Sequence, residues 1–263
     1  MKALGTPYSC YTACMVQYVG IVNVTPDSFS DGGEFFAAED AVRHAHELVA
    51  AGADIIDLGA QSTRPNAVHL TADEEWERLE SVLAGLAESD MTVSIDTFYP
   101  SVITRALAYF PELIINDVTT AHNIDMRRLV AASGLRILLS HLPFAASGDV
   151  QAAHQLKPLV DDVAVVKQEL LARRDELIRM GANPAQIILD PGIGFGKTMR
   201  LNAELVEFAH EVPGLPVLIG ASRKRFIEQH LGQDRFDPSV NTALNQKAAA
   251  AGARYLRVHE LPS

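Results

Sequence analysis

The sequence predicts one α/β domain over residues 1–263, folded as a (β/α)8 TIM barrel that lacks most or all of the eighth helix. Short apolar runs alternate with longer amphipathic segments, which is typical of parallel strands joined by crossover helices. The length of 263 residues suits such a barrel, and the 48% hydrophobic composition can fill its core. No linker, repeat or low-complexity tract divides the chain, so we expect a single domain.

Eight apolar runs are predicted to be strands, and the first sets the pattern. Val19, Ile21, Val22 and Val24 are β-branched and suit a strand that is buried on both faces. Asn23 near its end needs a polar partner, which points to a ligand or a metal ion. The predicted strands cover Tyr18–Val24, Asp54–Leu58, Thr92–Ile95, Leu113–Asn116, Arg136–Leu139, Gln186–Leu189, Pro216–Ile219 and Arg254–Val258.

Amphipathic segments between these runs are predicted to be helices. They cover Glu39–Ala51, Ala72–Glu88, Ser101–Tyr109, Asp125–Ser133, Leu159–Met180, Ala203–Glu211 and Asn241–Ala251. Several are followed by a glycine that can cap a helix before a short return loop, as at Gly52, Gly181 and Gly252. Only a few residues follow the eighth strand, so we expect the N-terminal segment or a partner subunit to cover that flank.

Composition and charge exclude several classes of function. A formal net charge of −11 without a dense Lys/Arg run disfavours nucleic-acid binding. No apolar stretch is long enough to span a bilayer, so no membrane partner is expected. Cys10 and Cys14 are the only cysteines and have no neighbouring ligand cluster, which favours reduced thiols and a cytoplasmic protein.

Polar residues recur at the same place relative to the strands. Each of the following lies at or just past the carboxyl end of a predicted strand: Asn23, Asp57, Asp96, Asn116, Asp190 and His259. In a barrel these ends share one face, where active sites are built. Any one of these side chains could instead cap a loop or a helix, but six in phase predict a site.

Seven motifs, in order from the first to the eighth strand, resemble those of the dihydropteroate synthase family. They are Asn23 to Gly33, Ser62 to Pro65, Val93 to Thr97, Ile115 to Asp117, Leu189 to Lys197, Ser222 to Lys224 and Arg257 to His259. The resemblance implies a (β/α)8 barrel that joins p-aminobenzoate to a pterin pyrophosphate in folate synthesis. It also implies a target of sulfonamides.

The edge of a pterin ring carries hydrogen-bond donors and acceptors, which a carboxylate beside a carboxamide can match. Asp96, Asn116 and Asp190 offer such groups. The resemblance adds Lys224 to this catalytic and pterin-binding set, and it places Ser140 in the pterin pocket.

A departing pyrophosphate requires cations and backbone donors around its charge. The resemblance assigns this role to Asn23, Arg257 and His259, and Arg64 can also hold the anion. The amide oxygen of Asn23 is a ligand that Mg2+ accepts together with phosphate oxygens and water, so Mg2+ is the expected cofactor. The residues that match the family's p-aminobenzoate pocket are Thr63, Pro65, Phe195, Ser222 and the stem of Lys224.

The chain departs from the usual family pattern at five positions. The second loop has Ala60, Gln61 and Asn66 where Gly, Glu and Gly are usual, Ser140 replaces a usual Met, and Glu260 replaces a usual Asp. These changes leave open catalytic competence and sulfonamide sensitivity. Two alternatives to a synthase are a methyltransferase that binds a methylated folate and a non-catalytic pterin-binding paralogue. Ser222 to Lys224 and the Thr25 to Ser30 loop favour the synthase, because a methyl carrier has no pyrophosphate to expel.

The oligomeric state is also open. Family members usually form dimers through the region of the seventh helix, where this chain carries the polar residues Asn245, Gln246 and Lys247. The resemblance implies a homodimer through this region.

Overall fold

The computed structural model describes residues 16–24, 33–62, 65, 67 and 69–262. Its strands form one parallel sheet in the order β6-β5-β4-β3-β2-β1-β8-β7. A bridge between Leu189 and Val217 joins β6 to the approach to β7 and closes the barrel. The strands are β1 (Gln17–Asn23), β2 (Ile55–Gly59), β3 (Val93–Asp96), β4 (Ile114–Asp117), β5 (Ile137–Ser140), β6 (Ile187–Asp190), β7 (Leu218–Ile219) and β8 (Tyr255–Val258). All eight predicted strands are confirmed, with bounds that differ by no more than two residues.

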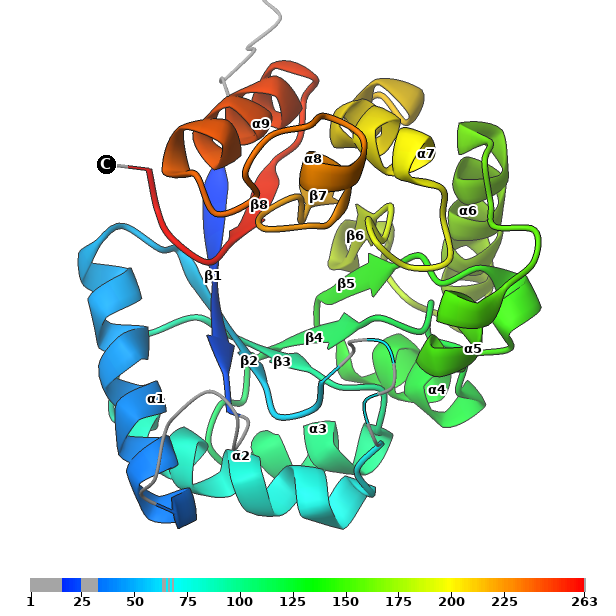
Figure 1. Cartoon of the computed structure of the whole chain (residues 1–263). Helices are drawn as coiled ribbons and strands as arrows, with labels where there is room; N and C mark the ends of the chain where they lie inside the picture. The colour runs from blue at the N-terminus through cyan, green and yellow to red at the C-terminus, as the bar shows by residue number, and fades with distance from the viewer. Residues whose placement is uncertain (1–15, 25–32, 63–64, 66, 68, 263) are drawn as a thin grey trace, which may run out of the picture.

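Helices surround this barrel (Figure 1). The α-helices are α1 (Gly33–Ala50), α2 (Ala72–Leu86), α3 (Pro100–Ala106), α4 (Ile124–Ser133), α5 (Val150–Gln155), α6 (Val163–Met180), α7 (Met199–Glu204), α8 (Phe226–Gln229) and α9 (Pro238–Ala250). Among the described residues, the 3-10 helices are η2 (Phe144–Ala146), η3 (Pro184–Gln186) and η4 (Leu205–Glu211). Within the described part of the chain, no helix is long and apolar enough to cross a membrane.

Several helical segments differ from the sequence prediction, and α1 and α9 begin at Gly33 and Pro238, before the predicted starts at Glu39 and Asn241. The predicted helix Leu159–Met180 begins at Val163, because the side chain of Asp162 caps it by accepting a hydrogen bond from the Ala164 N–H. The predicted helix Ala203–Glu211 is divided between α7 and η4, with a non-helical backbone at Glu207. Helices α5 and α8 were not predicted, because they are too short to show a clear apolar period.

The last described residues follow β8 without forming a helix. Leu261 packs partly buried against the core, close to Gly52 after α1. The N-terminal segment, which was one predicted cover for this flank, lies outside the described residues. The polypeptide after β8 therefore covers part of the flank itself.

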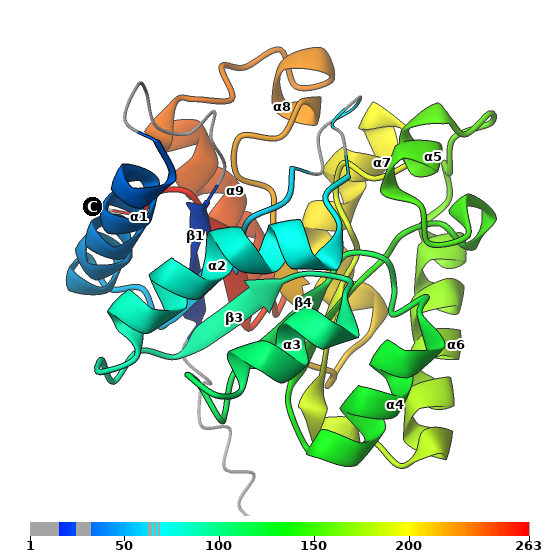
Figure 2. The same cartoon turned by 90° about the horizontal axis from the view of Figure 1, so that it is seen from below.

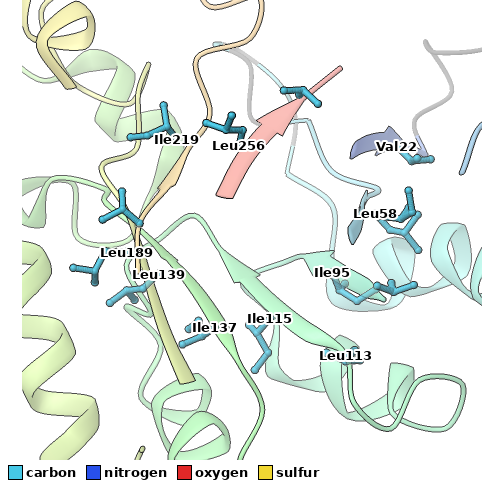
Figure 3. Close-up of a cluster of buried hydrophobic side chains, with 14 of the residues drawn as sticks. Val22, Leu58, Ile95, Leu113, Ile115, Ile137, Leu139, Leu189, Ile219 and Leu256 are labelled. Carbon is cyan, nitrogen blue, oxygen red and sulfur yellow. The ribbon is translucent and has the colours of Figure 1, made fainter. Parts of the chain in front are cut away.

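Most of the hydrophobic core lies between the barrel and its helices. Figure 3 labels members of this cluster from every strand, among them Val22, Leu58 and Ile95. A second cluster lies inside the barrel and consists of Val19, Ile55, Ile114, Leu138, Ile188 and Leu218, with Tyr255 packed against it. The barrel therefore has an apolar floor.

The alternation of side chains along a strand places a polar layer directly above this floor. A residue two positions after an inward-facing residue also faces inward. On β2, β4, β5, β6 and β8 these next residues are Asp57, Asn116, Ser140, Asp190 and Arg257. The inserted helices α5 and α8 lie at this same carboxyl end of the barrel (Figure 2). The fold therefore gathers the polar residues at the mouth where the sequence predicts the site.

The start of α2 depends on a capping box. Thr71 Oγ1 accepts from the Glu74 N–H at 3.3 Å, and Glu74 Oε2 accepts from the Thr71 N–H at 2.7 Å. We expect Thr71→Ala to lower the free energy of unfolding by about 1 kcal/mol, measured by urea titration. Thr104→Ala is the control, since that exposed hydroxyl only bonds the Pro100 carbonyl and its loss should change stability by less than about 0.5 kcal/mol. Equal losses in the two variants would contradict this role of the cap.

Candidate active site

An arginine and two carboxylates join three strands at the mouth of the barrel. Arg257 Nε on β8 donates to Asp57 Oδ2 on β2 at 2.6 Å. Its Nη2 donates to Asp96 Oδ2 on β3 at 2.9 Å. Asp57 is fully buried, and the guanidinium is largely so. The sequence-predicted residues Asp96 and Arg257 are therefore brought together as one ion network.

Asp57 is the centre of this network. In addition to Arg257, it accepts from Ser94 Oγ at 2.5 Å and from Asn116 Nδ2 at 3.0 and 3.2 Å. Asp57 is one of the polar residues predicted at the strand ends, but its position at the centre of a network is not apparent from the sequence. Because the amide nitrogen of Asn116 is bound to Asp57, its carbonyl oxygen is the group that it can offer to a ligand.

Asp190 forms a second anionic position across the mouth. Ser140 Oγ donates to Asp190 Oδ2 at 3.1 Å, and the Gly192 N–H donates to Asp190 Oδ1 at 2.8 Å. Gly192 has a φ of +64°, and a Cβ there would lie 2.0 Å from the His141 carbonyl oxygen. Glycine is therefore required for the chain to fold back onto the carboxylate. Ser140, which departs from the family pattern, is a hydrogen-bond partner of Asp190.

Lys224 and Phe195 face each other at the side of the site. Lys224 Nζ lies 5.1 Å from the centroid of the Phe195 ring, within range of a cation–π contact. The Phe195 loop is held from below by buried Lys197, whose Nζ donates to the carbonyl oxygens of Phe195, Gly192 and His141 at 2.9 to 3.2 Å. This role of Lys197 was not predicted, although the residue ends the Leu189 to Lys197 motif.

Ser222 and His259 connect the ends of β7 and β8. Ser222 Oγ lies 3.0 Å from His259 Nδ1, and the His259 N–H donates to Ser222 Oγ at 3.4 Å. Between Ser222 and Lys224, Arg223 has a φ of +58° and its guanidinium pairs with Glu260. The departure at Glu260 therefore preserves an acidic partner for Arg223.

Burial changes the acidity of the charged groups in the site. It raises the pKa of Asp96 to about 7, with Arg257 opposing the change and Asp57 adding to it. Burial also raises the pKa of Asp190. Burial and repulsion from Arg257 together lower the pKa of Lys224 to about 8. Near neutral pH, Asp96 can therefore be present as either an acid or a carboxylate.

Some predicted site residues cannot be placed. Thr63, Arg64 and Asn66 lie outside the described residues, as does the Thr25 to Ser30 loop. Pro65 is exposed in the second loop, Ala60 is buried at its start, and Gln61 bonds Glu75 of α2.

Asn23 is exposed at the end of β1, and the alternation of side chains places it on the same inward face of the strand as Val19. Among the residues that the structure describes, no group of three or more His, Cys, Asp or Glu side chains could hold a metal ion. Mg2+ commonly binds through one or two protein oxygens together with substrate phosphates and water. The amide oxygen of Asn23 therefore fits a Mg2+ ion that is bound mainly through its substrate.

The chain is similar to known proteins over nearly its whole length. The model of the pterin binding enzyme family matches residues 19–259. A dihydropteroate synthase of Mycobacterium leprae is 37% identical over 256 residues, covering 94% of this chain and 89% of the relative. The solved dihydropteroate synthase of Xanthomonas albilineans with 4-aminobenzoic acid is similar with a TM-score of 0.81 at 36% identity, covering 94% of this chain and 88% of that chain.

A second solved structure of the Xanthomonas albilineans enzyme is in complex with 7,8-dihydropteroate. It is similar with a TM-score of 0.79 at 33% identity, again covering 94% of this chain and 88% of that chain. Family model, relative and structures each span nearly the whole barrel. This chain therefore belongs to the pterin-binding enzymes and, among them, to the dihydropteroate synthase family of transferases.

Proposed function

We propose that this protein joins p-aminobenzoate to 6-hydroxymethyl-7,8-dihydropterin pyrophosphate and releases pyrophosphate, a step of folate biosynthesis. The observation that carries the proposal is the meeting of Asp57, Asp96, Asn116 and Arg257 in one network at the barrel mouth. Asp190 and Lys224 belong to the same charged cluster, because the charge of Arg257 acts on both. Attraction to Arg257 opposes the rise in the pKa of Asp190, and repulsion from Arg257 lowers the pKa of Lys224.

The pterin is held by groups from four strand ends in this proposal. Asp190 accepts hydrogen bonds from the guanidine-like edge of the ring, while the Lys224 ammonium donates to its carbonyl oxygen. Asn116 and Asp96 bind the opposite edge, where Asp96 can donate or accept because burial raises its pKa to about 7. Ser140 supports Asp190 through its hydroxyl.

The pyrophosphate is bound by Asn23, Arg64, Arg257 and His259 in this proposal. Mg2+ bound at Asn23 would supply positive charge that neutralises the departing phosphate oxygens. Two guanidinium nitrogens of Arg257 are engaged by carboxylates, so its contribution to the anion is that of a fixed, oriented charge. His259 is oriented for its role by Ser222.

The p-aminobenzoate pocket is formed by Thr63, Pro65, Phe195, Ser222 and the stem of Lys224 in this proposal. Phe195 provides an aromatic wall, and its contact with Lys224 keeps the lysine stem beside the ring. The Ser222 hydroxyl can donate to the carboxylate of p-aminobenzoate while it accepts from the backbone N–H of His259.

We further propose that pyrophosphate departs before the amine bond is complete. The carbon–oxygen bond breaks with its electron pair going to the pyrophosphate, and the pterin ring stabilises the methylene cation by conjugation. The neutral arylamine nitrogen then bonds to that carbon and afterwards loses its proton to solvent or pyrophosphate. Catalysis then depends on positioning and charge, with no requirement for a general base. Positional isotope exchange in the pyrophosphate without amine should be detectable, and its absence would contradict this order.

One assay separates the synthase from the alternatives. Purified protein is incubated with Mg2+, p-aminobenzoate and the pterin pyrophosphate, and both pyrophosphate and dihydropteroate are measured. Equal amounts of the two products are expected. Binding of the pterin without turnover would instead indicate a non-catalytic paralogue, and methyl transfer from a methylated folate would indicate the methyltransferase.

The ionisation of Lys224 predicts how the rate depends on pH. Its pKa is lowered to about 8, so the ammonium loses its proton as pH rises through this value. We expect kcat/KM for the pterin substrate to fall roughly tenfold for each pH unit above about 8. Lys224→Arg should remove this decline, because arginine stays protonated, while lowering the rate through altered geometry. A wild-type profile that is flat to pH 9.5 would contradict the assignment.

Two further properties stay proposals. We propose a cytoplasmic location, from the composition and from the interpretation of Cys10 and Cys14 as reduced thiols. We also propose a homodimer through the region of α9, where Gln246 is exposed, while Asn245 is buried and Lys247 pairs with Glu207 at 2.8 Å. Size-exclusion chromatography with light scattering tests the dimer.

A further inference from the structure

Gln61 closes the base of the second barrel loop. Its Oε1 accepts a hydrogen bond from the Leu70 N–H at 2.9 Å, although nine positions separate the two residues. Its Nε2 donates to Glu75 Oε2 on α2 at 3.0 Å. One side chain at the start of the loop thus binds both the end of the loop and the helix that follows.

Neighbouring contacts hold the same two ends. The Tyr99 hydroxyl donates to the Leu70 carbonyl oxygen at 2.6 Å, so both backbone groups of Leu70 are bound by side chains. Arg78 Nη1 on α2 donates to the Ala60 carbonyl oxygen at 3.3 Å. Both ends of the segment from Ser62 to His69 are therefore fixed to the barrel and to α2.

Glu75 is a buried acid that the proposed reaction does not use. Glu75 is fully buried, and burial raises its pKa to about 7. Gln61 Nε2 donates to its Oε2, and hydrogen bonds from the side chains of Thr97 and Gln61 oppose that rise. Among the described charged and titratable groups, Asp96 on β3 opposes the ionisation of Glu75, and Glu75 opposes the ionisation of Tyr99 before α3. Arg78, on the same helix as Glu75, is bound to the Ala60 carbonyl oxygen.

Only an amide satisfies both contacts of residue 61 regardless of the charge on Glu75. The Leu70 N–H requires an acceptor, and Glu75 Oε2 provides an acceptor that requires a donor. A carboxylate at position 61 could accept from Leu70 but could not donate to Glu75. Two carboxyl groups 3 Å apart would have to share a proton.

We propose that Gln61 and Glu75 are positioning residues that fix the ends of the second loop, which supports the binding of p-aminobenzoate. Because residue 61 is an amide, its hydrogen bonds to Leu70 and Glu75 are independent of pH. The role in substrate binding rests on the proposed function, since that function assigns Thr63 and Pro65 of this loop to the arylamine pocket. Neither Gln61 nor Glu75 touches the reacting atoms.

The contact itself is tested without any substrate, by hydrogen exchange of the Leu70 amide. Gln61→Ala should speed this exchange at least tenfold, while the amide of Ile188 in the barrel floor reports that the fold is intact. The same variant should raise KM for p-aminobenzoate about tenfold with a smaller change in KM for the pterin. Unchanged exchange at Leu70 would overturn the contact, and an equal rise in both KM values would overturn the positioning role.

A swapped pair provides the sharper test. In Gln61→Glu, the two carboxyl groups share a proton at low pH and lose it as pH rises. KM for p-aminobenzoate should therefore rise between pH 6 and 8, below the pH at which Lys224 loses its proton, while that of wild type stays flat over this range. The double variant Q61E/E75Q restores one donor and one acceptor and should restore the flat profile. A flat profile in Q61E alone, or no rescue in the double variant, would overturn the proposal. Absence of product from wild type would instead refute the proposed function and leave the exchange test valid.

Discussion

Replacing Asp190 with asparagine is expected to lower kcat/KM for the pterin pyrophosphate by about 100-fold or more. The carboxylate is buried at the mouth of the barrel, and Ser140 and the Gly192 N–H bind one oxygen each. A hydrogen bond to a charged group contributes about 1.5–3 kcal/mol, and loss of the carboxylate also leaves a donor on the pterin facing an amide N–H. Steady-state kinetics with the concentration of each substrate varied in turn measures the loss.

Ser140→Ala is the matched control for this variant. It removes only a neutral hydrogen bond to Asp190, so kcat/KM should fall about 3- to 10-fold. Circular dichroism melting verifies that both variants remain folded. If the Asp190→Asn enzyme turned over within threefold of wild type, the assignment of Asp190 to the pterin would be wrong.

Arg257→Met is expected to reduce the free energy of unfolding by about 3–5 kcal/mol at pH 7.5. The change leaves Asp57 and Asp96, which both bind this guanidinium, as neighbouring buried carboxylates without their cation. Burial already raises the pKa of Asp96 to about 7 while Arg257 opposes the rise, so in the variant this pKa lies still further above that of the unfolded chain. The folded state binds more protons, so stability should fall further as pH rises from 5 to 8. Urea unfolding across this range measures the slope.

Two controls make this prediction specific. Arg254→Met removes an exposed arginine of the same loop and strand region and should change stability by less than about 0.5 kcal/mol. Arg257→Met combined with Asp57→Asn removes one of the two stranded charges and should recover part of the loss and of the pH slope. A single Arg257→Met variant as stable as wild type at every pH would show that the network contributes nothing to folding.

The barrel, and the rim of it that carries the candidate site, could be predicted from the sequence alone. Strand positions followed from short β-branched runs, because a strand buried on both faces must be apolar along its length. The carboxyl-end position of Asp96, Asn116 and Asp190 followed from their place after such runs, because parallel strands end at the same rim. The family could be inferred because its motifs are local and occur in strand order.

Which of these residues contact each other could be learned only from the folded barrel. Asp57 and Arg257 are 200 positions apart, and no local pattern could show that one carboxylate would bind Arg257, Ser94 and Asn116 together. The partners of Lys197, and the use of Gln61 to bind Leu70 and Glu75, depend equally on how separate loops pack. The alternation of residues along a strand specifies which face of the strand a side chain occupies. The distances between side chains of different strands are set only when the barrel closes.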